Sequence, residues 1–178
     1  MRRYPLIAVL LPALFLALPA TTGAASAKPL PDHASVSDKG GDTPAGVDLV
    51  KGTYAISKDT AKWTAKVKKL TGTTFLAFEI WPLAAGWDRI AVYRENGKTF
   101  GKLYYVDNEE TPTPYARNCQ GLKVTWNFGT DKVSVKVPRK CFQASTKSAF
   151  PYEFHTFSRF GGQKNGPHDA LPKKTLDS

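Results

Sequence analysis

Apolar and polar residues alternate with a period of two along most of the middle of the chain. The clearest case is 132–137, where Val133, Val135 and Val137 are separated by polar residues. A half-buried strand of an antiparallel sheet requires this alternation. No segment has the 3.6-residue period of a long amphipathic helix. The pattern predicts about eight strands, at 47–56, 62–69, 74–81, 88–95, 98–106, 122–127, 132–137 and 150–157.

Turn residues separate these runs. Asn96-Gly97 lies between two of them, and Asn-Gly is a strong hairpin signal because both residues accept positive φ. Gly72 and Gly129-Thr130-Asp131 mark two further turns. Short strands at this spacing are typical of an all-β fold, and we predict a single antiparallel β-sandwich, jelly-roll-like, with one disulfide.

The first 27 residues have the pattern of a secretory signal peptide. Arg2 and Arg3 precede an apolar run over 6–18, and Ala25-Ser26-Ala27 offers the small residues of a cleavage site. The run is too short and too interrupted by proline to predict a membrane span. We therefore expect a secreted, extracellular protein that starts at Lys28 and does not insert into a membrane.

Both flanks of the predicted sandwich are rich in turn-forming residues. Segment 28–46 shows no sustained apolar period, and we expect a flexible leader there. Segment 161–178 contains Gly161-Gly162, Pro167 and Pro172 and few large apolar residues, and we expect a tail that at most packs locally. The predicted domain is therefore 47–160.

The chain is basic, with a formal net charge of +10. The expected signal holds two arginines and no acid, so the remainder carries about +8. Such a charge attracts polyanions. Six lysines fall on the polar faces of predicted strands: Lys62, Lys66, Lys68, Lys123, Lys132 and Lys136. They form a basic stripe if their strands are neighbours; the alternative is that they keep the protein soluble and protect exposed strands. Arg-rich and RNP-like motifs are absent, so no specific nucleic acid is expected.

The two cysteines, Cys119 and Cys141, are predicted to form a structural disulfide. If Asn127 pairs with Lys132, the apolar residues of two strands face each other, but Cys119 falls one residue out of register with Cys141. A bulge near Pro138, which cannot donate a ladder hydrogen bond, would correct this offset.

No recognisable catalytic motif is present, and we expect no enzyme. The one candidate carboxylate pair is Glu79 with Asp88, which would suit a hydrolase of glycosidase type. His155 is predicted to face solvent. The acidic run Asp107, Asn108, Glu109 and Glu110 is a candidate calcium site, although an acidic turn needs no metal. We expect no other cofactor.

Aromatic residues gather on three successive predicted strands, with arginines nearby. Exposed rings could stack on sugars while the arginines bind hydroxyl groups, but tryptophan and tyrosine also fill sandwich cores. Alternation places Tyr104 and Tyr105 on opposite faces. The candidate ligand-binding residues are Trp81, Trp87, Tyr104, Tyr105, Arg89 and Arg94. Loop 81–87 is alternatively a protein-binding tip.

Three stretches carry a family resemblance: 92–98, 119–126 and 133–141, the last two containing C-x-G and V-P-R-x-C. They resemble small exported β-sandwich proteins of unknown function from high-GC Gram-positive bacteria. The predicted sandwich is distantly similar at fold level to DOMON-like and family 9-like carbohydrate-binding modules, a likeness that does not determine function.

Together these observations predict a secreted, non-catalytic, monomeric binding module. Its expected ligand is extracellular carbohydrate or an anionic cell-wall polymer. The alternatives are a secreted protein–protein interaction or inhibitor module, and a hydrolase that uses Glu79 and Asp88.

Overall fold

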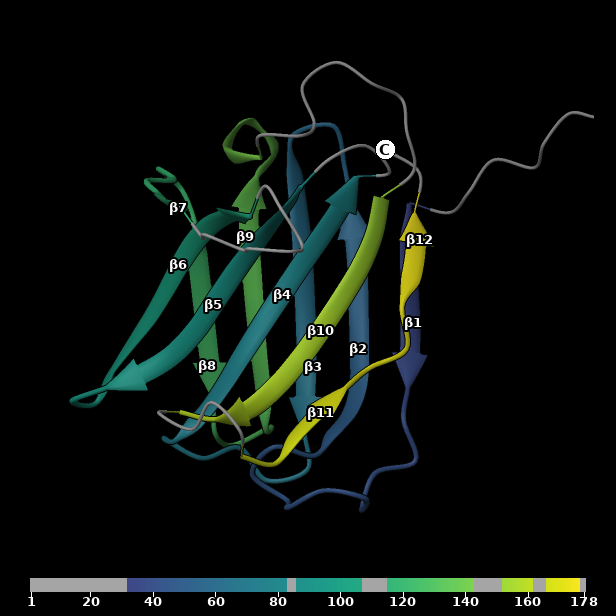
Figure 1. The fold of residues 1–178 in the computed structure, drawn as a ribbon, viewed down its shortest axis with the longest axis vertical. Helices are drawn as coiled ribbons and strands as arrows, with labels where there is room; N and C mark the ends of the chain where they lie inside the picture. The colour runs from purple at the N-terminus through teal and green to yellow at the C-terminus, as the bar shows by residue number, and fades with distance from the viewer. Residues whose placement is uncertain (1–31, 83–85, 107–114, 143–151, 162–165, 177–178) are drawn as a thin grey trace, which may run out of the picture.

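Two antiparallel sheets pack against each other in the computed structural model (Figure 1), which confirms the predicted β-sandwich. The structure describes residues 32–82, 86–106, 115–142, 152–161 and 166–176. The strands are β1 (His33–Ser37), β2 (Leu49–Ile56), β3 (Thr60–Val67), β4 (Thr74–Pro82), β5 (Trp87–Glu95), β6 (Lys98–Val106), β7 (Tyr115–Arg117), β8 (Lys123–Asn127), β9 (Lys132–Pro138), β10 (Tyr152–Phe160), β11 (His168–Ala170) and β12 (Lys174–Leu176). One 3-10 turn, η1 (Arg139–Cys141), follows β9.

The two sheets are assembled mostly from strands that are consecutive in the chain. The five-stranded sheet has the order β1-β2-β3-β9-β8. The seven-stranded sheet has the order β11-β10-β4-β5-β6-β7, and β12 also pairs with β10. Only the β3–β9 and β4–β10 pairings, among the described strands, join segments that are far apart in sequence.

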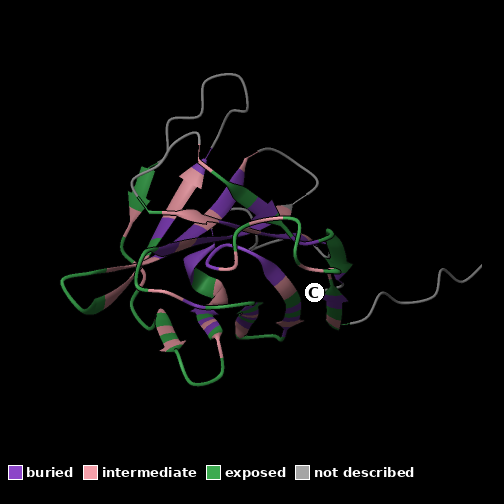
Figure 2. Ribbon diagram, turned by 90° about the horizontal axis from the view of Figure 1, so that it is seen from below, coloured by how far each residue is buried: buried purple, intermediate pink, exposed green. Residues whose placement is uncertain are grey.

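The core lies between the sheets, where the buried residues gather in Figure 2. The predicted alternation is realised on β3, where Ala61, Trp63, Ala65 and Val67 are fully buried. Gly101 on β6 allows the sheets to approach, because a Cβ at this position would clash with Val124 on β8. The inward faces of both sheets therefore form one continuous apolar layer.

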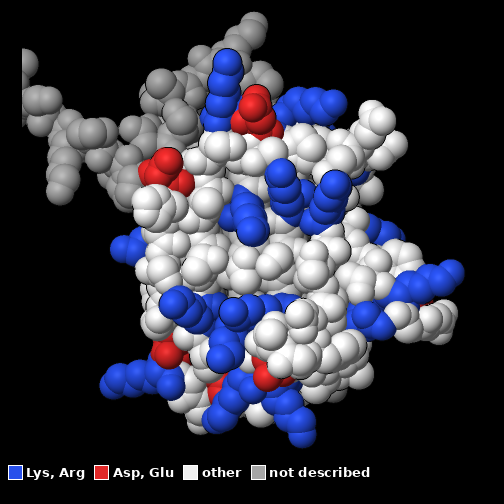
Figure 3. All heavy atoms as spheres, turned by 180° about the vertical axis from the view of Figure 1, so that it is seen from behind, with Lys and Arg blue, Asp and Glu red and all other residues white. Residues whose placement is uncertain are grey.

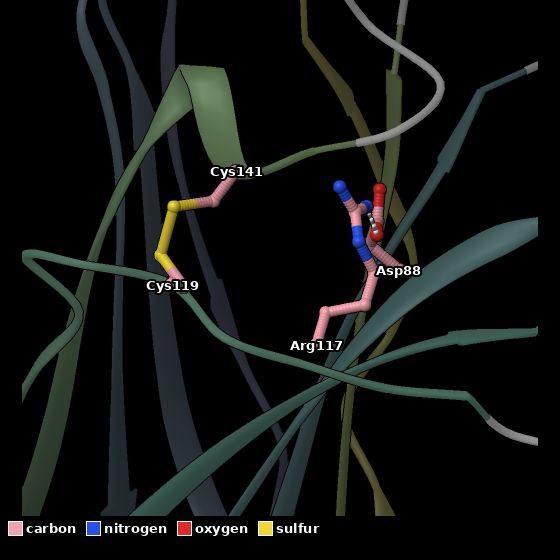
Figure 4. The surroundings of a disulfide bond; sticks show 4 residues. All are labelled: Asp88, Arg117, Cys119 and Cys141. Carbon is pink, nitrogen blue, oxygen red and sulfur yellow. Dashed lines mark hydrogen bonds and ion pairs between the residues drawn. A yellow bond between two sulfur atoms is a disulfide. The ribbon is translucent and has the colours of Figure 1, made fainter.

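The hairpin register and the disulfide are confirmed. Asn127 pairs with Lys132 and Trp126 with Val133, and Cys119 is bonded to Cys141 with a Cα–Cα distance of 5.5 Å (Figure 4). The chain leaves strand geometry at Pro138, and the turn η1 brings Cys141 to its partner. A 3-10 turn after the proline, instead of a bulge within the strand, absorbs the offset.

The Asn-Gly hairpin is also confirmed. Asn96 and Gly97 both have positive φ, 51° and 76°, and they connect β5 directly to β6. A turn of this kind matches the right-handed twist of the strands on either side of it.

The flanking segments differ from expectation. Within 28–46, expected as a flexible leader, β1 pairs with β2 and buries Val36. Within 161–178, β11 and β12 both pair with β10, and Leu171 and Leu176 are buried in the core. The predicted boundaries of 47 and 160 are therefore too narrow. These strands hold only three to five residues, too few to produce a visible period.

Residues 1–31, which contain the expected signal, lie outside the described residues. Among the described residues, there is no helix long and apolar enough to span a membrane.

Candidate functional site

Six lysines cover the outer side of the five-stranded sheet in two rows, and we call this surface the lysine face. One row crosses β3, β9 and β8, where Lys136 lies opposite both Lys62 and Lys123. The other crosses β2, β3 and β9, where Lys66 lies opposite both Lys51 and Lys132. All six side chains are exposed. Strand pairing thus brings together residues that are far apart in the sequence.

A row of hydroxyl groups separates the two lysine rows. It crosses all five strands and consists of Ser35, Thr53, Thr64, Ser134 and Thr125. The Thr64 and Ser134 hydroxyls are hydrogen-bonded at 2.9 Å. Seen from behind in Figure 3, two bands of basic side chains lie on either side of an uncharged strip. The surface therefore offers cations on both sides of a strip of hydroxyl groups.

Nothing acidic balances these charges within the sheet. Strands β1, β2, β3, β8 and β9 contain no aspartate or glutamate. Lysines occupy four directly opposed cross-strand pairs, and like charges in that position are destabilising. The lysine face is therefore an arrangement that packing and stability do not explain.

The lysine face differs from the predicted stripe at two positions. Lys68 lies beyond the end of β3, with its Nζ 3.6 Å from the buried Asp48 carboxylate. Lys51 joins the face, although the sequence pattern did not single it out. A register shift between Leu49 and Lys51 breaks the alternation there, and this break concealed its orientation.

Three rings on the outer side of the seven-stranded sheet form one stack. Trp81 lies parallel to Trp87 at 4.2 Å between ring centroids and nearly parallel to His155 at 5.0 Å. Strands β5 and β10 flank β4, so the two rings approach Trp81 from opposite sides. Trp87 is only 6% exposed. The stack leaves neither flat face of Trp81 open as a platform for a sugar.

The other candidate ligand-binding residues do not converge on these tryptophans. Tyr104 lies opposite Arg89 and Tyr105 opposite Asp88, so the two tyrosines point to opposite sides as predicted. Arg94 lies at the β5–β6 hairpin, where it donates to the Gly97 carbonyl and stacks over Phe128 at 5.1 Å. Residues 83–85, the tip of the loop proposed as a protein contact, are outside the described residues.

Glu79 and Asp88 cannot act as a carboxylate pair, because they lie on opposite sides of one sheet. Glu79 pairs with Arg89, and Asp88 pairs with the inward-facing Ile80. Asp88 is fully buried between the sheets, and Arg117 Nη1 reaches it at 3.4 Å (Figure 4). The alternative of a hydrolase in which Glu79 and Asp88 act on one bond is therefore wrong.

His155 does not face solvent, contrary to the sequence-based expectation. It is 4% exposed, because the rings of Trp81 and Phe157 lie against it. Its Nε2 lies 2.7 Å from Glu153 Oε1. Burial lowers the pKa of His155 below its usual value, although the Glu153 carboxylate opposes this shift.

We expect stability to fall as the pH drops from about 6.5, because the unfolded histidine takes up a proton before the buried one does. One proton limits the slope to about 1.4 kcal/mol per pH unit. Urea unfolding between pH 7.5 and 5.5 measures how the free energy of unfolding depends on pH. The His155→Phe variant is expected to show a smaller dependence. The exposed His168→Gln is the control; an equal loss of slope in that variant would contradict the assignment to His155.

The expected calcium ligands at 107–110 lie outside the described residues. A different acidic group is present, where carboxylate oxygens of Asp38, Asp42 and Asp169 lie within 4.8 Å of one another. Burial, together with the charges of Asp42 and Asp38, raises the pKa of Asp169. Its two oxygens accept hydrogen bonds from the Leu49 and Ala170 amides. Asp169 therefore anchors β11 to the start of β2.

Comparison with protein-family models, curated proteins and solved structures gives no match to this chain. What this protein binds is therefore inferred from its own residues and their arrangement.

Proposed function

We propose that this protein is a non-catalytic binding module that holds an anionic extracellular polymer on the lysine face. The observation that carries the proposal is the set of four opposed lysine pairs in a sheet without acidic residues. Such pairs lower stability in the free protein. A bound polyanion would neutralise them, so the arrangement has a physical use when a ligand is present.

The dimensions of the lysine face suit an extended chain. Rows separated by four residues along a strand are about 13 Å apart, and three neighbouring strands span about 10 Å. A polymer that lies across the strands therefore meets three lysines along one row. The hydroxyl row beside it can donate to and accept from a polyol or sugar backbone. These features favour an acidic polysaccharide or a phosphate-bearing wall polymer.

A neutral polysaccharide fits this surface less well. The outward positions of the five strands carry lysine, serine, threonine and a few other small or polar side chains, and none of them is tryptophan, tyrosine or phenylalanine. Sugar-binding surfaces that lack charge complementarity use flat rings to cover the apolar side of the sugar. The lysine face therefore favours an anionic polymer over a neutral one.

Replacing Lys66, Lys132 and Lys136 together by glutamine is expected to weaken binding to isolated cell walls and to polyglutamate about tenfold, at roughly 0.5 kcal/mol per lost ion pair. The same variant is expected to unfold at a higher urea concentration, because it loses all four opposed lysine pairs. Co-sedimentation across a salt series and urea unfolding measure the two effects.

The matched control replaces Lys58, Lys98 and Lys140, which are exposed and lie outside the lysine face. Its net charge equals that of the first variant, yet we expect it to retain most of the binding. Equal losses in both variants would mean that net charge alone attracts the polymer. That result would overturn the proposal.

A further inference from the structure

A small hollow opens on the outer side of the seven-stranded sheet, the side opposite to the lysine face. Its volume is about 170 Å³. Side chains and backbone from β4, β5, β10 and β11 line it: Phe75, Ala77, Glu79, Arg89, Phe157, Ser158, Arg159 and His168. Pockets for drug-sized ligands are usually about 300–1,000 Å³, so this one has room for a single ring.

The buried carboxylate of Glu79 fixes the orientation of Arg89 in one wall of the hollow. Glu79 is 1% exposed, and each of its two carboxylate oxygens accepts a hydrogen bond. Trp81 Nε1 donates to Oε2 at 2.9 Å, and Arg89 Nε donates to Oε1 at 2.5 Å. Burying a carboxylate is costly unless it is paired and hydrogen-bonded. Glu79 is fully satisfied here, and its effect is to hold the Arg89 guanidinium in one orientation.

The terminal nitrogens of Arg89 remain available. Its contact with Glu79 is made through Nε, and neither Nη has a hydrogen-bond partner among the described residues. The Arg89 side chain is 40% exposed at the hollow. A guanidinium oriented in this way presents two parallel N–H groups, a geometry that matches a carboxylate.

A second cation lies across the hollow. Arg159 stacks over the Phe75 ring at 4.5 Å and lies opposite His168 on β11. Within the described ranges Arg159 forms no ion pair. The Glu79 charge is already balanced by Arg89, so Arg159 leaves the hollow with an excess of positive charge. Ala77 and Phe157 also line the hollow and give it apolar surface.

We propose that this hollow binds a carboxylate carried on one sugar-sized ring, as in a uronic acid. Arg89 binds the carboxylate through its two terminal nitrogens, Arg159 adds a second positive charge, and the apolar part of the ring covers Ala77 and Phe157. Glu79 is a positioning residue for Arg89. The site lies on a different sheet from the lysine face, so it can be tested separately from the polymer-binding proposal.

Amide NMR shifts of the whole protein during titration with D-glucuronate test the site. We expect saturable shifts at 77–79, 89–91 and 157–159, with D-glucose and acetate binding at least tenfold more weakly, since each lacks part of the ligand. Arg159→Gln and, separately, Arg89→Lys are each expected to weaken glucuronate binding about tenfold, the usual effect of losing one charge-assisted hydrogen bond. Two variants keep the test valid if one of them fails to fold.

The triple lysine variant of the preceding section is the matched control and is expected to bind glucuronate unchanged. Shifts confined to β3 and β9, or equally strong binding of glucose or acetate, would overturn the proposal. So would tighter binding of inorganic phosphate than of glucuronate. Unchanged affinity in both arginine variants would also overturn it.

Discussion

Replacing Trp63 by alanine is expected to lower the free energy of unfolding by about 3–5 kcal/mol. The side chain is fully buried on β3, and its ring contacts Phe78 at 6.5 Å and Phe154 at 5.3 Å between centroids. Both partners belong to the other sheet. A cavity at this position therefore removes aromatic contacts that hold the two sheets together, and urea or thermal unfolding measures the loss.

Trp63→Phe is the matched control for that experiment. It keeps a ring against the same partners, and it removes the indole Nε1, which is buried without a hydrogen-bond partner among the described residues. An unsatisfied buried donor is itself unfavourable, so we expect a clearly smaller loss than with alanine. Equal losses for the two substitutions would show that the inter-sheet aromatic contacts contribute little.

Removing the disulfide with Cys119→Ala and Cys141→Ala is expected to cost about 3 kcal/mol in the chain-entropy model. The bond joins residues that are 22 positions apart, and it closes the open end of the β8–β9 hairpin. Strand β8 is an edge strand that pairs only with β9 among the described strands. We therefore expect β8 to fray first in the variant, and Lys123 to leave its place opposite Lys136.

Urea unfolding of the oxidised protein, the reduced protein and the double alanine variant measures this effect. Reduced protein and the variant are expected to agree, because both lack the cross-link. A variant as stable as the oxidised protein would mean that the edge of the sheet needs no covalent closure. Amide hydrogen exchange at Lys123–Asn127 then shows whether the strand opens locally.

The long strands could be predicted because each has enough residues to display its period. Segments such as β3 and β9, with eight and seven residues, alternate without interruption. Strands β7, β11 and β12 have three residues each and depend on a neighbouring strand for their hydrogen bonds. A single sequence holds no signal for such pairing.

The candidate sites, like the strands, could be predicted only in part from the sequence. Alternation correctly placed Lys62, Lys132 and Lys136 on outer faces, but the β3–β9 pairing that unites them joins residues about 70 positions apart, as in the Thr64–Ser134 contact. For His155, alternation identified the correct side of the sheet and the wrong environment. Trp81 on the neighbouring strand β4 packs against the ring and buries it. Contacts between strands of this kind cannot be deduced from a period of two.

The two long-range strand pairings also set the order in which the chain can fold. The segments β1–β3 and β4–β7 can form local meanders as soon as they are synthesised, but each lacks a neighbour that lies far downstream. The five-stranded sheet cannot be completed before β9 is synthesised, and the seven-stranded sheet cannot be completed before β10, which ends at Phe160. All-β sandwiches fold slowly, in about milliseconds to seconds, because strand pairing between distant parts of the chain must be established. A growing chain therefore exposes apolar strand faces until β10 has emerged. During that interval, lysines on those strands oppose their association with other chains.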